Sequence, residues 1–143
     1  MNWYQVKARL ERVAENGAIK ADSEVFLVKA NSFATAERVT MGEVVQYAAG
    51  GVDVVAMARK NYKEVFASNE VDADKWFKCK LNFLTIDEKS GKEKKTAHLF
   101  LVKAVSALTA HQAVDAFMDT SLSDYVIEQV EDTKIIDVIE CAG

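Results

Sequence analysis

Two short segments of the 143-residue sequence place an indole close to several cations. Trp3 is followed by Lys7 and Arg9, and Trp76 is followed by Lys78 and Lys80. Indole rings stack on unpaired nucleic-acid bases, at about 1 to 3 kcal/mol per base, while lysine and arginine side chains follow the phosphates. These residue types therefore predict a binding surface for single-stranded DNA or RNA.

The same two segments alternate apolar and polar residues, which is the pattern of a half-buried strand. Strands are therefore predicted over residues 3–13 and 76–86. If the apolar residues of each strand face a core, the indole and the cations of that strand all face outward. The apolar residues are Tyr4, Val6, Ala8 and Leu10 in the first strand and Phe77, Cys79, Leu81 and Phe83 in the second.

Each of these strands is followed by a copy of the pentapeptide Phe-Leu-Val-Lys-Ala, at Phe26–Ala30 and Phe100–Ala104. Matches on both sides of the copies keep an offset of 73 or 74 residues, which indicates one unit built twice. Lys29 and Lys103 lie within the copies and extend the two basic sets.

The order of elements is the same in both copies. The first copy predicts strands over 3–13 and 21–30 joined by a tight Asn16-Gly17 turn, a helix that Thr35 caps better than Ser32, and strands over 52–60 and 62–67. The helix is expected to continue until Gly50-Gly51. In the second copy Thr109 is the expected cap, and the last strands cover residues 125–130 and 134–139.

We expect an α+β fold made by tandem duplication of a ββαβ(β) unit, with antiparallel sheets and one helix per repeat. The repeats span about residues 1–70 and 74–141. Because one unit leaves a sheet face and a helix face uncovered, the two are expected to share a core around a pseudo-two-fold axis. Residues 1–143 would then form a single domain.

Composition limits the classes of protein that fit. Half of the residues are hydrophobic, yet the apolar runs are too short to span a bilayer, and no secretory signal is visible. We therefore expect a cytoplasmic protein that does not contact membranes. The net charge of −4 gives no general attraction to nucleic acid but allows a local basic surface.

The sequence favours a protein without catalytic activity. His98 and His111 lie in different elements with no third ligand at a suitable spacing, so we expect no metal site and no cofactor. No serine, histidine and acid recur together in the two copies. Cys79 and Cys141 are not paired in the sequence, and Cys79 is expected to be a buried, inert thiol.

Two alternatives remain open for the indoles and cations. Trp3 and Trp76 are also the kind of residue that packs over a helix edge or in a dimer interface. Equally, the same residues can bind a small anionic nucleotide or a protein partner. The strands at 62–67 and 134–139 are expected edges that can pair between chains in a homodimer.

Several segments together resemble an uncharacterised family, the domain of unknown function numbered 4494, over nearly the whole chain. The resemblance implies a setting in gut bacteria or their tailed phages, where DNA replication, host takeover or evasion of defence would be plausible roles. The matching segments are Trp3-Tyr4-x-Val6-Lys7, Glu15-Asn16-Gly17, Asn61-Tyr62-x-Glu64-Val65-Phe66, Trp76-Phe77-x-Cys79-Lys80, residues 87–95 and Ile135-Ile136-Asp137-Val138.

Overall fold

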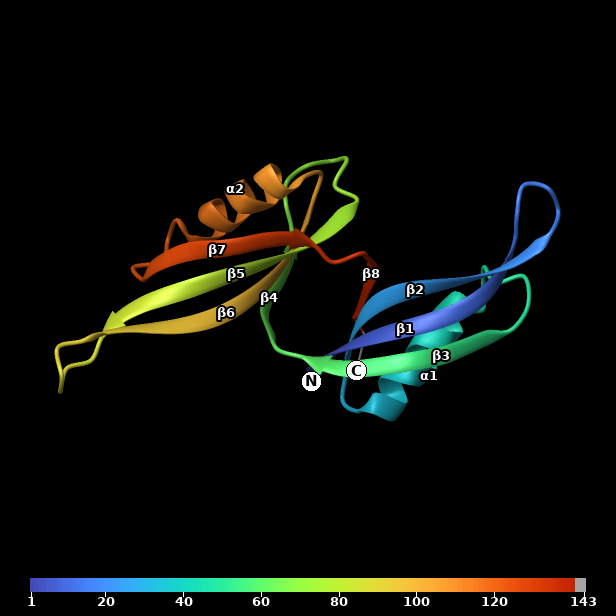
Figure 1. The fold of residues 1–143 in the computed structure, drawn as a ribbon, viewed down its shortest axis with the longest axis horizontal. Helices are drawn as coiled ribbons and strands as arrows, with labels where there is room; N and C mark the ends of the chain where they lie inside the picture. Colours follow the sequence, from blue (N-terminus) through green and yellow to red (C-terminus); the bar gives the residue numbers. More distant parts are fainter. Residues whose placement is uncertain (141–143) are drawn as a thin grey trace. The chain divides into compact units, whose positions relative to one another are not determined.

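The computed structural model describes residues 1–140 and divides the chain into two compact units. Unit 1 contains Met1–Asn61 and the strand Ile135–Glu140, and unit 2 contains Tyr62–Lys134. Each unit has a four-stranded mixed sheet and one helix (Figure 1). The α+β class is therefore confirmed.

Unit 1 begins with a long hairpin of strands β1 (Asn2–Val13) and β2 (Ile19–Ala30). Helix α1 (Phe33–Val44) and strand β3 (Val52–Lys60) follow, and strand β8 (Ile135–Glu140) completes the sheet. The strand order is β3-β1-β2-β8.

Unit 2 begins with strand β4 (Tyr62–Ala67), which precedes a second long hairpin of β5 (Lys75–Ile86) and β6 (Glu93–Ala104). Helix α2 (Ala107–Met118) and strand β7 (Asp124–Asp132) complete the unit. The strand order is β4-β6-β5-β7.

Two strands pair outside the half of the sequence that they belong to. β4 follows β3 along the chain but lies parallel to β6 in unit 2, whereas β8 follows β7 but lies parallel to β2 in unit 1. The prediction of purely antiparallel sheets is therefore wrong, because each sheet contains one parallel pair. We call this arrangement the strand exchange.

Short connections explain why the strands are exchanged. If β4 stayed in the sheet that contains β3, it would have to lie beside β2, at the opposite edge from β3 and parallel to β3. Such a parallel return needs a crossover of a dozen or more residues, but only Asn61 separates β3 from β4. Likewise only Thr133 and Lys134 separate β7 from β8. The chain therefore continues directly into the other sheet.

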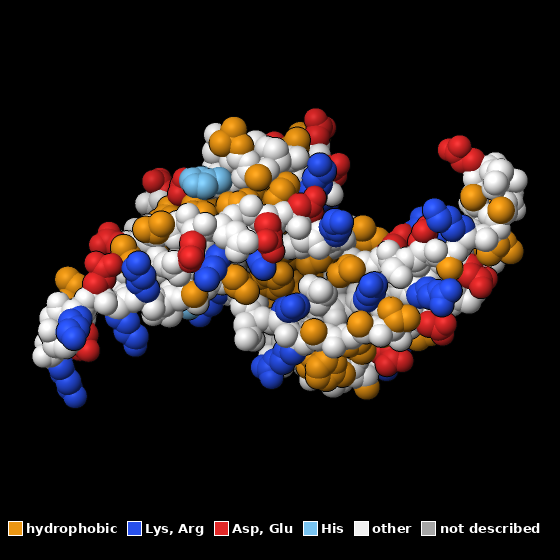
Figure 2. Space-filling view, in the orientation of Figure 1, with side chains coloured by type: hydrophobic (Ala, Val, Ile, Leu, Met, Phe, Trp, Pro, Cys, Tyr) orange, Lys and Arg blue, Asp and Glu red, His pale blue; other side chains and the backbone are white. Residues whose placement is uncertain are grey.

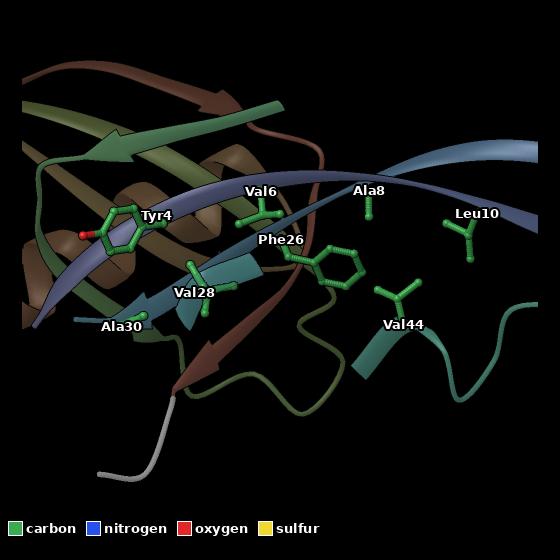
Figure 3. Close-up of a cluster of buried hydrophobic side chains, with 9 residues drawn as sticks. Tyr4, Val6, Ala8, Leu10, Phe26, Val28, Ala30 and Val44 are labelled. Carbon is green, nitrogen blue, oxygen red and sulfur yellow. The ribbon is translucent and has the colours of Figure 1, made fainter. Parts of the chain in front are cut away.

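Each unit has a hydrophobic core between its helix and one face of its sheet. In unit 1, Tyr4, Val6, Ala8 and Leu10 of β1 contribute alternate side chains to this core, as the sequence pattern predicts (Figure 3). Residues of β2 and α1, among them Phe26, complete the cluster. The core of unit 2 uses the corresponding residues Phe77, Cys79, Leu81, Phe100, Val102, Val114 and Met118.

The helix caps differ from the prediction. Ser32 caps α1 and Ser106 caps α2, and each serine side chain accepts a hydrogen bond from the backbone N–H three residues later. The predicted caps, Thr35 and Thr109, therefore lie inside the helices, at the position that donates this bond. α1 also ends at Val44, before the predicted glycine stop.

Candidate functional site

The predicted basic and aromatic residues of unit 1 lie on the sheet face opposite α1. The alternation of β1 puts Trp3, Lys7 and Arg9 on this face, because the residues between them enter the core. Trp3 is partly exposed and lies opposite Lys29 on β2 and Lys60 on β3. The Nζ atom of Lys29 is 5.6 Å from the centre of the indole ring.

Lys7 and Arg9 are exposed, and within the described part of the chain neither forms an ion pair. We call Trp3, Lys7, Arg9, Lys29 and Lys60 the unit 1 basic face. Carboxylates flank it, since Asp53 lies opposite Arg9 and Glu140 lies beside Lys29. Figure 2 shows Lys and Arg side chains over the strands of unit 1, interspersed with Asp and Glu.

The equivalent tryptophan of unit 2 has a different environment. Trp76 lies opposite Lys103, whose Nζ atom is 5.9 Å from the ring centre, so the lysine and indole are paired as in unit 1. However, only 7% of Trp76 is exposed, and its indole N–H has no hydrogen-bond partner among the described residues. The N–H and hydroxyl of Thr133 both donate to its carbonyl oxygen. The ring of Trp76 is therefore not available for the stacking that the sequence predicted.

The predicted cations of β5 are paired with carboxylates of β7. The Nζ atom of Lys78 is 2.9 Å from an oxygen of Glu131, and that of Lys80 is 3.5 Å from Glu128. The Nδ2 atom of Asn82 also donates to Glu128, and this hydrogen bond, with the charge of Lys80, lowers the pKa of the Glu128 carboxyl. Unit 1 thus has a cationic surface with a partly exposed indole. In unit 2 the lysines of the equivalent surface are neutralised by carboxylates.

Sequence reasoning missed Glu128 and Glu131, although both lie in or beside the predicted strand at residues 125–130. Alternation alone would have placed Glu128 and Glu131, three residues apart, on opposite faces of that strand. Both reach the lysine face because the register against β5 shifts between Ile127 and Gln129, which the sequence did not show.

Sequence reasoning also missed a cavity of about 610 Å³ in unit 2. It lies on the helix-covered face, between β4, the C-terminal end of α2 and the sheet. Its lining includes His98 and none of the predicted site residues. The ring of His98 contacts the ring of Phe83 edge to face, with the centres 4.9 Å apart.

The remaining candidates for chemistry lie apart from these two places. Cys79 is completely buried, and burial raises the pKa of its thiol to about 11, which confirms a buried thiol with little thiolate character. Cys141 lies outside the described residues. His111 contacts the Asp115 carboxylate on the exposed side of α2, at 3.3 Å.

The described residues offer no candidate for two other kinds of site. No group of three or more His, Cys, Asp or Glu residues is placed to hold a metal ion. None of the described helices is both long and apolar enough to cross a membrane.

Comparison with known proteins identifies one family. The model of a family described as Domain of unknown function (DUF4494) matches residues 2–141. No curated protein and no solved structure matches the chain.

Proposed function

The chain belongs to the family described as Domain of unknown function (DUF4494), and we propose that it binds single-stranded nucleic acid, without catalysis, on the unit 1 basic face. The observation that carries this proposal is the position of Trp3, which is partly exposed between lysines of both neighbouring strands. A base stacked on this indole would have a cation on either side for its phosphates.

The dimensions of the face suit a strand of several nucleotides. Neighbouring strands of a sheet are about 4.8 Å apart, so Lys29 and Lys60 lie close to the indole on each side. Along β1, the six-residue step from Trp3 to Arg9 covers about 20 Å at about 3.4 Å per residue. A backbone that lies along β1 would therefore meet Lys7 and Arg9 in turn.

Lys29 gives the face a defined resting state. Its ammonium group lies near the indole through a cation–π contact of the kind that contributes about 0.5 to 1 kcal/mol at exposed sites. An incoming base would replace this contact with stacking, while the freed ammonium group could bind a phosphate. The indole is thus oriented before the ligand arrives.

Fluorescence anisotropy with labelled oligo-dT tests the proposal directly. We expect micromolar or tighter binding at low salt, with log K falling by about 3 per tenfold rise in salt if four cations each contact a phosphate. Trp3→Ala should weaken binding by about 5- to 150-fold, the equivalent of 1 to 3 kcal/mol. Unchanged affinity in a folded Trp3→Ala variant would exclude stacking on this residue.

The chain offers a matched control for charge. Lys7→Ala/Arg9→Ala removes two cations that form no ion pair within residues 1–140, whereas Lys78→Ala/Lys80→Ala removes two cations that already contact carboxylates. The first pair of substitutions should weaken binding and reduce the salt slope by about 1.4, and the second should change both much less. Equal effects of the two pairs would indicate general electrostatic attraction.

Ligand length separates this function from its alternative, a binding module for a small anionic nucleotide or a protein partner. Affinity that grows from two to about ten nucleotides supports a strand track, and affinity that saturates at one or two nucleotides supports the module. The proposed setting is the cytoplasm of a bacterium or of a phage-infected cell. A homodimer through the edge strands β4 or β8 would double the basic face.

We further propose that the chain arose by tandem duplication of the ββαβ(β) unit. The two long hairpins keep the same register, since Trp3 lies opposite Lys29 as Trp76 lies opposite Lys103. Both sheets have an irregularity at the same step of the hairpin's first strand, after Lys7 and after Lys80. If the two units had arisen independently, the same hairpin register and the same position of the irregularity would not be expected in both.

A further inference from the structure

The cavity of unit 2 has no role in the function proposed above, because every residue of the unit 1 basic face lies in the other unit. Its volume of about 610 Å³ is in the range of small-molecule sites. Its floor is the helix-covered face of β5 and β6, and its walls are β4 and the segment that follows α2.

The two units carry different residues at one position of the cavity lining. His98 lies opposite Leu81 in unit 2, at the register position where Glu24 lies opposite Ala8 in unit 1. In unit 1 that position is filled by a polar cluster, because Glu24 pairs with Arg12 and accepts a hydrogen bond from the hydroxyl of Tyr47.

The Tyr47 ring completes the cluster, 5.2 Å from the guanidinium of Arg12. Unit 2 has an imidazole ring, His98, in place of the Glu24 carboxylate.

Aromatic rings form the apolar part of the cavity and are held in place by one another. Phe117 stacks on Phe66 with ring centres 4.6 Å apart and planes 13° apart, and it meets Phe100 edge to face at 5.7 Å. Phe83 meets His98 edge to face. Such fixed rings suit a flat apolar ligand, because little side-chain freedom is lost on binding.

The polar part of the cavity can hydrogen-bond but has little net charge. Hydroxyl groups come from Thr120, Ser121 and Ser123, and each can donate and accept. Lys63 and Glu64 both line the cavity and contribute one positive and one negative charge to it.

The end of α2 further disfavours an anion. The helix ends at Met118, which lines the cavity, and the last carbonyl groups of a helix carry partial negative charge. A phosphate would therefore find one cation and one carboxylate, together with an unfavourable helix end.

We propose that this cavity binds a small, uncharged, planar heteroaromatic molecule of the nucleobase or nucleoside class. The ring would lie against Phe83 and Phe117, and the hydroxyl groups, His98 and Glu64 would meet its polar edge or sugar. The site favours nucleosides over the corresponding nucleotides, because its one lysine, Lys63, shares the lining with the Glu64 carboxylate and with the C-terminal end of α2.

Titration of the full chain with adenosine, guanosine, cytidine and uridine, and with their 5′-monophosphates, tests this proposal by calorimetry. We expect saturable binding of at least one nucleoside and at least fivefold weaker binding of its monophosphate. Absence of saturable binding by all four nucleosides would overturn the proposal, and so would tighter binding of the monophosphates.

Substitution locates the site. His98→Leu should weaken nucleoside binding at least tenfold, whereas Glu24→Gln, at the equivalent position of unit 1, should leave it unchanged. Chemical-shift mapping of the unmodified chain provides a second measurement that does not depend on a variant folding. Perturbations should cluster on β4, β6 and the residues after α2, and perturbations confined to unit 1 would contradict the site.

The outcome is distinguishable from that for strand binding. Trp3→Ala should weaken oligo-dT binding and leave nucleoside binding intact, and His98→Leu should do the reverse. Loss of both activities in either variant would refute two independent sites.

Discussion

Trp3 and Trp76 occupy the same position in their hairpins, but only one of them has an accessible ring. Both lie opposite a lysine whose ammonium group is within 6 Å of the indole. Trp76 is 7% exposed, whereas Trp3 is partly exposed and has a lysine on each neighbouring strand. Under the proposed function, the exposure of this one ring decides which unit stacks a base.

The thiol of Cys79 predicts a loss of stability in alkali. Burial raises its pKa to about 11, well above the ordinary value for a thiol, so the folded protein holds this proton more tightly than the unfolded chain. The stabilisation is complete below about pH 8.5 and is lost as the pH rises through 11. The loss amounts to about 3 kcal/mol of the free energy of unfolding.

Urea unfolding between pH 8 and pH 11 measures this loss, and Cys79→Ala should remove most of the slope. Tyr125 titrates higher, because burial and its hydrogen bond to Asp115 raise its pKa to about 12, so Tyr125→Phe is the control for pH values above 10. An unchanged slope in Cys79→Ala would show that another group is responsible.

Thr40 is a buried polar residue whose hydroxyl can be removed at little cost. The hydroxyl donates to the carbonyl of Ala36 at 2.8 Å, one helical turn earlier, and the side chain is completely buried in α1. In α2 the residue at the same place is Val114, which is also completely buried. We expect Thr40→Val to change the free energy of unfolding by less than about 1 kcal/mol.

Thr40→Ala is the matched variant, because it removes the methyl group as well and should cost about 1 to 2 kcal/mol through the small cavity it leaves. Denaturant titration of both variants distinguishes packing from hydrogen bonding. If Thr40→Val were the more damaging of the two, the hydroxyl would be the important group.

At the scale of the elements, both helices depend on a serine that precedes them. The Ser106 side chain accepts from the N–H of Thr109, and the Thr109 hydroxyl accepts from the N–H of Ser106, so two exposed amides are satisfied at once. Ser106→Ala should lower the free energy of unfolding by about 1 kcal/mol. Ser32→Ala in α1 should have a similar effect.

Thermal unfolding followed by circular dichroism checks this prediction. Thr35→Ala serves as the control, because Thr35 donates its backbone N–H to Ser32 and this bond survives the substitution. A larger loss in Thr35→Ala than in Ser32→Ala would favour the threonine as the important residue.

Local signals in the sequence predicted most elements, and the reasons for the failures are physical. Alternation placed β1 and β5 correctly. The Asn16-Gly17 turn was predicted as a tight two-residue turn, but residues 14–18 separate the strands and φ is positive at Gly17, 83°, and not at Asn16. Ser and Thr three residues apart can exchange the same hydrogen bonds, so the choice between them as caps needed the backbone geometry. The partner of β4 is decided by the length of its connection rather than by its own residues.

In the candidate sites, too, the sequence predicted what local residues determine and not what distant residues determine. Spacing predicted that Trp3, Lys7 and Arg9 share a face, because one strand determines it. The burial of Trp76 and the ion pairs of Lys78 and Lys80 depend on residues more than 45 positions away in sequence, such as Glu128. The unit 2 cavity is a space left between side chains of several elements, and no local sequence pattern predicts such a space.

At the scale of the whole molecule, the strand exchange makes each unit depend on both halves of the sequence. A break at Val71, which is fully exposed between the repeats, leaves the first fragment without β8 and the second without β4. Neither fragment should fold alone, because the edge of its central hairpin and part of its core stay uncovered.

Mixing the two fragments should restore a folded one-to-one complex, which native mass spectrometry and circular dichroism would detect. Protein cleaved at Val71 only after folding is the control and should stay assembled. If either fragment folds alone as a monomer with native chemical shifts, the exchanged strand is not required.

The strand exchange also orders events during synthesis on the ribosome. Unit 2 is a continuous stretch of chain, whereas unit 1 begins with β1 and requires β8 (Ile135–Glu140), which is made only after the whole of unit 2. The half that emerges first is therefore the last to be completed, in contrast to the usual order in which N-terminal domains finish first. Until then the edge of β2 is open, and neighbouring nascent chains or chaperones would find an unpaired strand there.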